Sequence, residues 1–256
     1  MRRAAAIGLA CLLASPTGAE IARNQRRSDF GQMSPETRAM QSDDTANPGM
    51  LAVLDGEALW NAKAGPAAQS CADCHGDARV SMKGVAARYP AWSASRAAPI
   101  DLAGQIDTCR AERQGVPAWR PESPDRLAVT AFVAHQSRGL PIAPPKDPGM
   151  DAARERGRKL FTARMGQLDL SCAACHDDNW GRRLAGAPIP QAHPVGYPIY
   201  RLDWQSVGSL QRRFRNCMTG VRAEAYPYDA PELVELEAFL MERAAGLAIE
   251  TPAVRP

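Results

Sequence analysis

The sequence predicts an all-α protein built from two tandem copies of one unit of roughly 100 residues. Three observations predict this class. Two long segments of the chain align with each other, apolar residues recur at helical spacing in both segments, and the alternating pattern of strands is scarce. Both segments also contain the pattern C-x-x-C-H, at Cys71–His75 and at Cys172–His176.

The first nineteen residues, MRRAAAIGLACLLASPTGA, are typical of a cleaved secretory signal peptide. Two arginines precede an apolar run from Ala4 to Ala14, and Pro16 and small residues follow it. This run is shorter than the roughly 20 residues that a membrane-spanning helix needs. A lipid anchor at Cys11 is disfavoured because this cysteine lies inside the run. We therefore expect a periplasmic protein without a membrane span, with residues 1–19 removed.

The composition disfavours a nucleic-acid or membrane-surface protein. The formal net charge is only +3 at pH 7, and the basic residues are scattered along the chain. Five Phe, five Tyr and five Trp stand against 21 Pro and 20 Gly, which leaves few large aromatic side chains to fill two cores. Residues 20–50 are polar and without pattern. We expect them to form an extended N-terminal arm that lies over the domains or over a partner.

The repeated C-x-x-C-H pattern predicts two covalently bound haem c groups. In this motif two thiols add to the porphyrin vinyl groups, and the adjoining histidine ligates the iron. One match can arise by chance, whereas two matches in an exported chain are strong evidence. The predicted attachment residues are Cys71, Cys74, Cys172 and Cys175, and the predicted iron ligands are His75 and His176.

The alignment around these motifs indicates an internal duplication. GEALWNAKAGPAAQSCADCHGD from Gly56 and GRKLFTARMGQLDLSCAACHDD from Gly157 align without a gap at an offset of 101 residues. The match resumes at a Tyr-Pro pair and closes with AFVAHQSRGLPI and AFLMERAAGLAI. Each copy reads as a helix, the haem motif, a loop, a short helix and a terminal helix.

This order of elements resembles class I cytochrome c, whose haem supplies much of the core. The resemblance implies two cytochrome c-like domains over residues 51–140 and 153–256, with haem-filled cores that explain the shortage of aromatic residues. The Pro-rich residues 141–152 fit a linker between them.

Each copy has one further cysteine, Cys109 or Cys217, at 20 residues after the tyrosine of its Tyr-Pro pair. In both copies two apolar residues precede the cysteine by seven and three positions, which places the thiol on the apolar face of a short helix. We expect these thiols to be the second axial ligands of the two irons.

Other assignments remain open for this position. Two leftover cysteines in an oxidising compartment would ordinarily form a disulfide, here Cys109 to Cys217. Met82, Met218 or His193 are alternative iron ligands. Met82 lacks a counterpart in the second copy, and His135 aligns with a glutamate, so neither fits a duplicated role.

The two haem motifs, the lone downstream cysteines and above all the stretch RRFRNC make the chain resemble the SoxA family, the dihaem subunits of the SoxAX cytochromes of thiosulfate oxidation. The resemblance covers roughly residues 56–246. It implies His75 and Cys109 as ligands of haem 1, and His176 and Cys217 as ligands of haem 2. It also implies a possible persulfide on Cys217 and a functional Arg213.

The residues themselves make the two copies unequal. Arg213 precedes Cys217 by one helical turn and so lies on the same face, whereas the aligned residue in the first copy is Gln105. A cation there favours a thiolate and binds an anionic sulfur oxoacid through a planar fork of donors. We expect Gln105 to offer neither effect to Cys109.

The resemblance implies an L-cysteine S-thiosulfotransferase that joins thiosulfate to a carrier-protein cysteine. Its partners would be a SoxX-like monohaem cytochrome c, which receives the electrons, and a SoxYZ-like carrier. Two other functions compete: a dihaem thiosulfate dehydrogenase that forms tetrathionate, and an electron-transfer cytochrome without substrate. Cysteine at both ligand positions argues against the first, and Arg213 beside Cys217 argues against the second.

Overall fold

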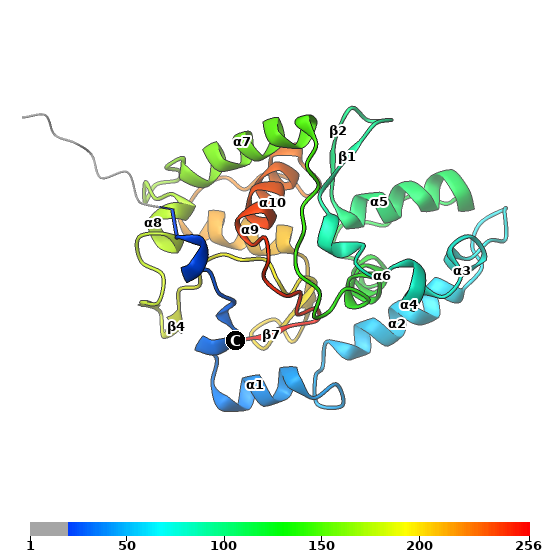
Figure 1. The fold of residues 1–256 in the computed structure, drawn as a ribbon, viewed down its shortest axis with the longest axis horizontal. Coiled ribbons are helices and arrows are strands. Elements are labelled where there is room, and N and C mark those ends of the chain that lie inside the picture. Colours follow the sequence, from blue (N-terminus) through cyan, green and yellow to red (C-terminus); the bar gives the residue numbers. More distant parts are fainter. Residues whose placement is uncertain (1–19) are drawn as a thin grey trace, which may run out of the picture.

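The computed structural model describes residues 20–256, so the predicted signal peptide lies outside the described residues. Two helical units lie side by side (Figure 1). Residues 50–135 form the first unit and residues 148–243 supply the helices of the second. Within the described part of the chain, no helix is both long enough and apolar enough to cross a bilayer.

The first unit begins and ends with long helices. Between them lie the haem motif, a hairpin and a short helix that continues into a π-helical turn. Its elements are α2 (Met50–Asn61), α3 (Cys71–His75), α4 (Ala78–Ser81), a 3-10 turn η3 (Ala86–Arg88), β1 (Ala91–Ser93), β2 (Ala98–Ile100), α5 (Leu102–Cys109), the π-helical turn η4 (Arg110–Gln114) and α6 (Pro124–His135).

Within the described residues, the second unit repeats the order of long helix, haem motif, hairpin, helix and terminal helix, lacks counterparts of α4, η3 and η4, and adds two features. A small hairpin follows its haem motif, and a C-terminal strand pairs in parallel with β5. Its elements are α7 (Pro148–Thr162), α8 (Cys172–His176), β3 (Arg183–Leu184), β4 (Ala187–Pro188), β5 (Ile199–Arg201), β6 (Ser206–Gly208), α9 (Leu210–Gly220), α10 (Pro231–Arg243) and β7 (Val254–Arg255).

The first and last helices of each unit cross at a glycine. A Cβ on Gly56 of α2 would lie 2.1 Å from the Ala128 carbonyl oxygen of α6, and a Cβ on Gly157 of α7 would lie 2.0 Å from the Glu235 carbonyl oxygen of α10. No real side chain tolerates such distances, so both crossings require glycine. The alignment of Gly56 with Gly157 therefore reflects one packing contact made twice.

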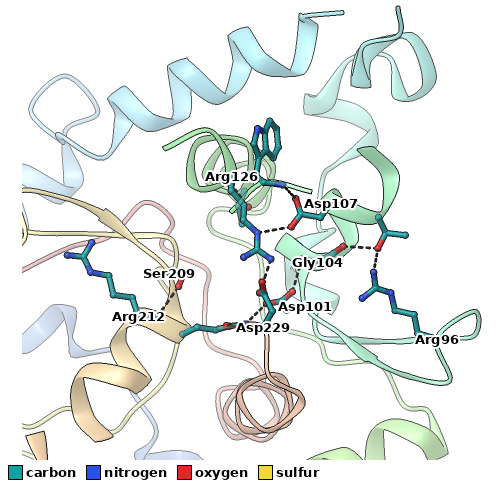
Figure 2. Close-up of polar contacts among 12 residues, drawn as sticks. Arg96, Asp101, Gly104, Asp107, Arg126, Ser209, Arg212 and Asp229 are labelled. Atoms are coloured by element: carbon teal, nitrogen blue, oxygen red, sulfur yellow. Dashed lines mark hydrogen bonds and ion pairs between the residues drawn. The ribbon is translucent and has the colours of Figure 1, made fainter. Parts of the chain in front are cut away.

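The polar link between the units centres on Arg126 of α6 (Figure 2). Its guanidinium is buried and forms ion pairs of 2.8 Å with Asp107 of the first unit and with Asp229 of the second. Gln211 of α9 donates to Asp101 at 3.0 Å and accepts from the Asp229 backbone N–H at 2.7 Å. These buried bonds join α5, α6, α9 and the turn before α10 into one body.

Three parts of the predicted architecture need correction. The all-α class omits the short strands, which have two or three residues each and are too short to produce an alternating pattern. The segment 141–152 is not all linker, because α7 begins at Pro148, where proline at the first position suits a helix start. The arm is only partly extended, since residues 20–50 include the turns η1 (Arg23–Gln25) and η2 (Asp29–Gln32) and the helix α1 (Pro35–Ser42).

The arm packs on the second unit before it leads into α2. In Figure 1 it runs from beside α8, past the C-terminal strand β7, to α1. Asp29 pairs with Arg255 at 2.6 Å, Gln41 accepts from the Val254 backbone N–H at 3.0 Å, and the Asn47 amide donates to the Pro252 carbonyl oxygen at 2.9 Å. The arm thus connects the surface of the second unit to the first helix of the first unit.

Candidate haem sites and reactive cysteine

Each haem motif folds into a short helix of its own, and the two helices have the same kind of N-terminal cap. Ser70 caps α3 and Ser171 caps α8, each by accepting a hydrogen bond from the backbone N–H three residues later. The cap starts the helix at the first cysteine, so the second cysteine and the histidine follow within one turn. Both motifs therefore present two thiols and an imidazole from a rigid turn, which fits a covalently attached haem c.

His176 is held by the chain around it. Its Nδ1 donates to the Pro190 carbonyl oxygen at 2.7 Å, which leaves Nε2 as the free ring nitrogen. Burial, helped by the guanidiniums of Arg213 and Arg243, lowers the pKa of His176 to about 4. The imidazole is therefore neutral at pH 7, as an iron ligand must be. A backbone carbonyl is one of the usual partners of the ring nitrogen that does not bind the metal in a metal-binding histidine.

His75 has a different environment. It is exposed, and its ring lies 5.7 Å from the Trp60 ring, centroid to centroid. Trp60 in turn donates through its indole nitrogen to the Gly76 carbonyl oxygen at 3.2 Å. The first histidine is thus positioned by an aromatic contact, whereas the second is fixed by a hydrogen bond.

The structure brings Cys217 and Arg213 together with the second haem motif. Cys217 lies near the end of α9, close enough to Cys172 and Cys175 to contribute to the raised pKa of both thiols, where burial is the main cause. Burial opposes the charge of Arg213, but Cys217 and Tyr197 favour it, and the pKa of Arg213 is raised overall. A permanent cation therefore stands beside the thiol.

In the first unit Cys109 ends α5, close enough to Cys71 to influence its pKa, which burial raises. The predicted pairing of each downstream cysteine with its own haem motif is consistent with this placement. Gln105 supplies no cation to Cys109, as expected, but its amide donates to the sulfur at 3.4 Å, a contact that the sequence did not predict. The first thiol has a neutral donor where the second has a cation.

The alternative assignments can be placed as well. All six cysteines within residues 20–256 are free thiols, so Cys109 and Cys217 form no disulfide. Met218 is 3% exposed and packs into the core of the second unit with Leu210 and Phe214. His193 donates from Nδ1 to the Arg27 carbonyl oxygen of the arm at 2.8 Å.

Two groups near Arg213 were not singled out from the sequence. Tyr197 lies close to both Arg213 and Cys217, and burial raises its pKa to about 12, so it stays a neutral phenol. Its presence in both Tyr-Pro pairs was the available signal. The second group is the Pro190 carbonyl oxygen on His176; a backbone atom of a loop leaves no trace in the residue pattern.

Comparison with known proteins identifies the class of protein to which this chain belongs. The sequence model of the family described as SoxA/TsdA, cytochrome c domain, matches the chain twice, at residues 55–142 and 156–249. The crystal structure of SoxXA from P. pantotrophus superposes with a TM-score of 0.86 at 30% identity, over 90% of this chain and 86% of that one. The fold and the sites therefore define a c-type cytochrome.

Relatives of known function indicate which family of c-type cytochromes this chain belongs to. The SoxA subunit of L-cysteine S-thiosulfotransferase from Pseudaminobacter salicylatoxidans is 41% identical over 86% of this chain and 77% of its own length. The corresponding subunit from Rhodovulum sulfidophilum is 34% identical over 94% and 85%. The chain belongs to the SoxA family. It is accordingly an enzyme subunit of the L-cysteine S-thiosulfotransferase class, a transferase of thiosulfate oxidation.

Proposed function

We propose that this protein joins thiosulfate oxidatively to a cysteine of a carrier protein, with Cys217 as the reactive sulfur and Arg213 as the anion-binding group. The observation that carries the proposal is the difference between the two downstream cysteines. Cys217 has the guanidinium of Arg213 one helical turn before it. Its counterpart Cys109 has the neutral amide of Gln105.

We infer that the chain holds two haem c groups, one in each unit, and that the units arose by duplication. Cys71 and Cys74 would hold haem 1 with His75 and Cys109 on its iron; the second set is Cys172, Cys175, His176 and Cys217. Free thiols on a capped turn and a neutral imidazole oriented through Nδ1 fit this group. When bound, a haem c supplies an iron that passes single electrons.

Arg213 binds and orients the substrate. Thiosulfate is a dianion whose sulfonate end matches the planar fork of a guanidinium, and Arg213 lies in a half-buried position where such hydrogen bonds are strong. With the sulfonate held there, the outer sulfur of thiosulfate faces Cys217. We infer that Cys217 carries an additional sulfur as a persulfide, which makes it a sulfur centre able to form an S–S bond.

The overall reaction balances with a one-electron acceptor. The carrier thiol loses its proton, an S–S bond forms between the carrier sulfur and the outer sulfur of thiosulfate, and two electrons leave. Two equivalents of an oxidised c-type cytochrome take them. The SoxXA structure supports a SoxX-like monohaem partner for this role. A SoxYZ-like carrier and a periplasmic location complete the proposal.

The experiment compares two alanine variants in the haem-loaded protein. Cys217→Ala should lose on the order of 10³-fold or more of carrier-dependent, thiosulfate-driven cytochrome reduction, because the reacting sulfur is gone. Cys109→Ala removes the same ligand type from the other haem and should stay at least about tenfold more active. Full activity of Cys217→Ala would refute the proposal, and tetrathionate formed without a carrier would indicate a dehydrogenase.

A further inference from the structure

The loop that holds His176 is itself held by the N-terminal arm. Gln191 follows Pro190, whose carbonyl oxygen accepts from His176, and its side chain is 2% exposed. The Gln191 amide oxygen accepts from the Arg27 backbone N–H at 2.9 Å, and its amide nitrogen donates to the Gln25 carbonyl oxygen at 3.1 Å. One buried side chain thus uses both ends to bind the arm backbone.

Two further contacts tie the same arm residues to this region. His193 donates to the Arg27 carbonyl oxygen at 2.8 Å, so Arg27 is bound through both its backbone groups. The Arg27 guanidinium lies over the Trp180 ring, 4.8 Å from its centroid. Trp180 comes four residues after His176, so the arm contacts the chain on both sides of the histidine's hydrogen bond.

Arg243 holds the loop from the inner side. It is 2% exposed, donates from Nε to the Gln191 carbonyl oxygen at 3.3 Å, and forms an ion pair with Asp177, the residue after His176. Its guanidinium also lies over the Phe161 ring. The segment from Pro190 to Gln191 is therefore fixed between α10 on one side and the arm on the other.

We propose that Gln191 is a positioning residue for the second haem: by docking Gln25 and Arg27 it holds the Pro190 carbonyl oxygen in place and so fixes the His176 imidazole. This inference rests on the proposed role of His176 as an iron ligand. The hydrogen-bond partner of the ring nitrogen that does not bind the iron sets the orientation and basicity of a ligating histidine. A loop anchored only by α10 would let the imidazole rotate.

The test uses the complete haem-loaded protein and reads both haems. Gln191→Leu keeps the volume and removes both bonds to the arm. We expect it to shift the midpoint potential of haem 2, to broaden the low-spin EPR signal of haem 2, and to lower turnover about tenfold. The haem 1 signal should not change. Deletion of residues 20–27 should produce the same shift, and combining it with Gln191→Leu should add nothing further.

The matched control is Gln41→Leu. Gln41 also binds the arm to the second unit, through Val254 and Glu250, but it does not touch the loop at Pro190. Its replacement should leave both haem signals as they are. Unchanged haem 2 signals in both Gln191→Leu and the deletion, or an equal shift in Gln41→Leu, would overturn the proposal. The haem 2 signals test the role of Gln191 alone, whereas the activity of Cys217→Ala tests the reactive sulfur. A shift of the haem 2 signals in Gln191→Leu would therefore support the positioning role even if Cys217 is not the reactive sulfur.

Discussion

The two halves of this molecule share a scaffold and differ in the groups around it. Both cross two helices at a glycine, cap the haem-motif helix with a serine and carry a half-buried cysteine at or near the end of the helix that follows the hairpin. Around the cysteine, however, Gln105 is replaced by Arg213. Under the proposed function, a duplicated iron site would acquire substrate chemistry through a neighbour of the ligand, while the ligand itself stays the same.

The histidines differ in the same way. His75 is exposed and leans on Trp60, whereas His176 donates to the Pro190 carbonyl oxygen within a loop fixed by Gln191 and Arg243. A fixed ligand is what a site needs when its second ligand takes part in the reaction. Both differences, at the cysteine and at the histidine, support the proposal that the second unit carries the reactive site.

The largest loss is expected when the second site receives the residue of the first. Arg213→Gln should lower kcat/KM for thiosulfate by about 10²-fold to 10³-fold, the usual effect of removing one stabilising donor from a catalytic site. An amide keeps a hydrogen bond to the sulfur, as Gln105 does to Cys109 at 3.4 Å, but it cannot neutralise a bound dianion. Steady-state kinetics with the carrier present would measure the loss.

The control is the neighbouring arginine. Arg212 lies over the Trp204 ring, 4.1 Å from its centroid, on another face of α9. Arg212→Gln should change kcat/KM only a few-fold, as expected for a screened surface charge. Equal losses in both variants would mean that the general positive charge of α9 matters and not the position next to Cys217.

A smaller effect should appear equally in both halves. Gly56→Ala and Gly157→Ala each force a Cβ to about 2 Å from a carbonyl oxygen of the facing helix, so the helices must move apart. Overpacking of this kind costs about 1 to 3 kcal/mol. For a chain of this size that corresponds to roughly 2–4 °C in Tm for each 1 kcal/mol.

Thermal unfolding followed by circular dichroism measures this loss. Gly31→Ala is the matched control, because a Cβ there meets nothing within 4 Å. A wild-type Tm in only one of the two glycine variants would show that the helix crossing is not an equivalent contact in the two units.

The sequence predicts the repeated parts of this molecule well, because residues that recur at aligned positions can be recognised in the sequence. Gly56 and Gly157, the two haem motifs and the two downstream cysteines each occur twice at matching positions. The contacts that the sequence does not predict occur in only one of the two units. Gln191, Arg243 and the arm make contacts across long sequence separations, and the accepting atoms belong largely to the backbone. No residue pattern encodes which carbonyl oxygen will face His176.

The same reason explains the missed Gln105 contact. An amide at one turn before a thiol is compatible with solvent exposure or with a hydrogen bond, and only the packing around α5 selects between them. The strands and the start of α7 were missed for a local reason. Segments of two or three residues carry no period, and a proline can begin a helix as readily as it can mark a loop.

The smallest expected effect concerns a cavity of about 90 Å³ between the units. Glu237 of α10 lines it where the aligned residue of α6 is Thr130, whose hydroxyl donates to the Arg126 carbonyl oxygen at 2.7 Å. Burial raises the pKa of Glu237 well above its ordinary value of 4.5, and the nearby Asp101 carboxyl raises it further. The folded protein therefore keeps a proton that the unfolded chain releases.

The free energy of unfolding falls with rising pH because of Glu237. Below pH 4.5 Glu237 is protonated in both states and costs nothing. As the pH rises, the unfolded chain ionises first, so the free energy of unfolding falls until the pKa of the folded state is passed. Glu237→Gln stays neutral and should have a higher Tm than the wild type at pH 8 but an equal Tm at pH 4. Each 1 kcal/mol relieved corresponds to about 2–4 °C.

Asp101 complicates this measurement, because burial raises its pKa as well, while the Gly104 backbone N–H and Arg126 lower it. Both carboxyls face the same cavity, so part of the wild-type pH dependence belongs to Asp101 and should persist in Glu237→Gln. The difference between the two Tm curves isolates Glu237. A Tm difference that does not grow between pH 4 and pH 8 would mean that Glu237 ionises as easily in the folded protein as in the unfolded chain, so that burial in the cavity does not raise its pKa.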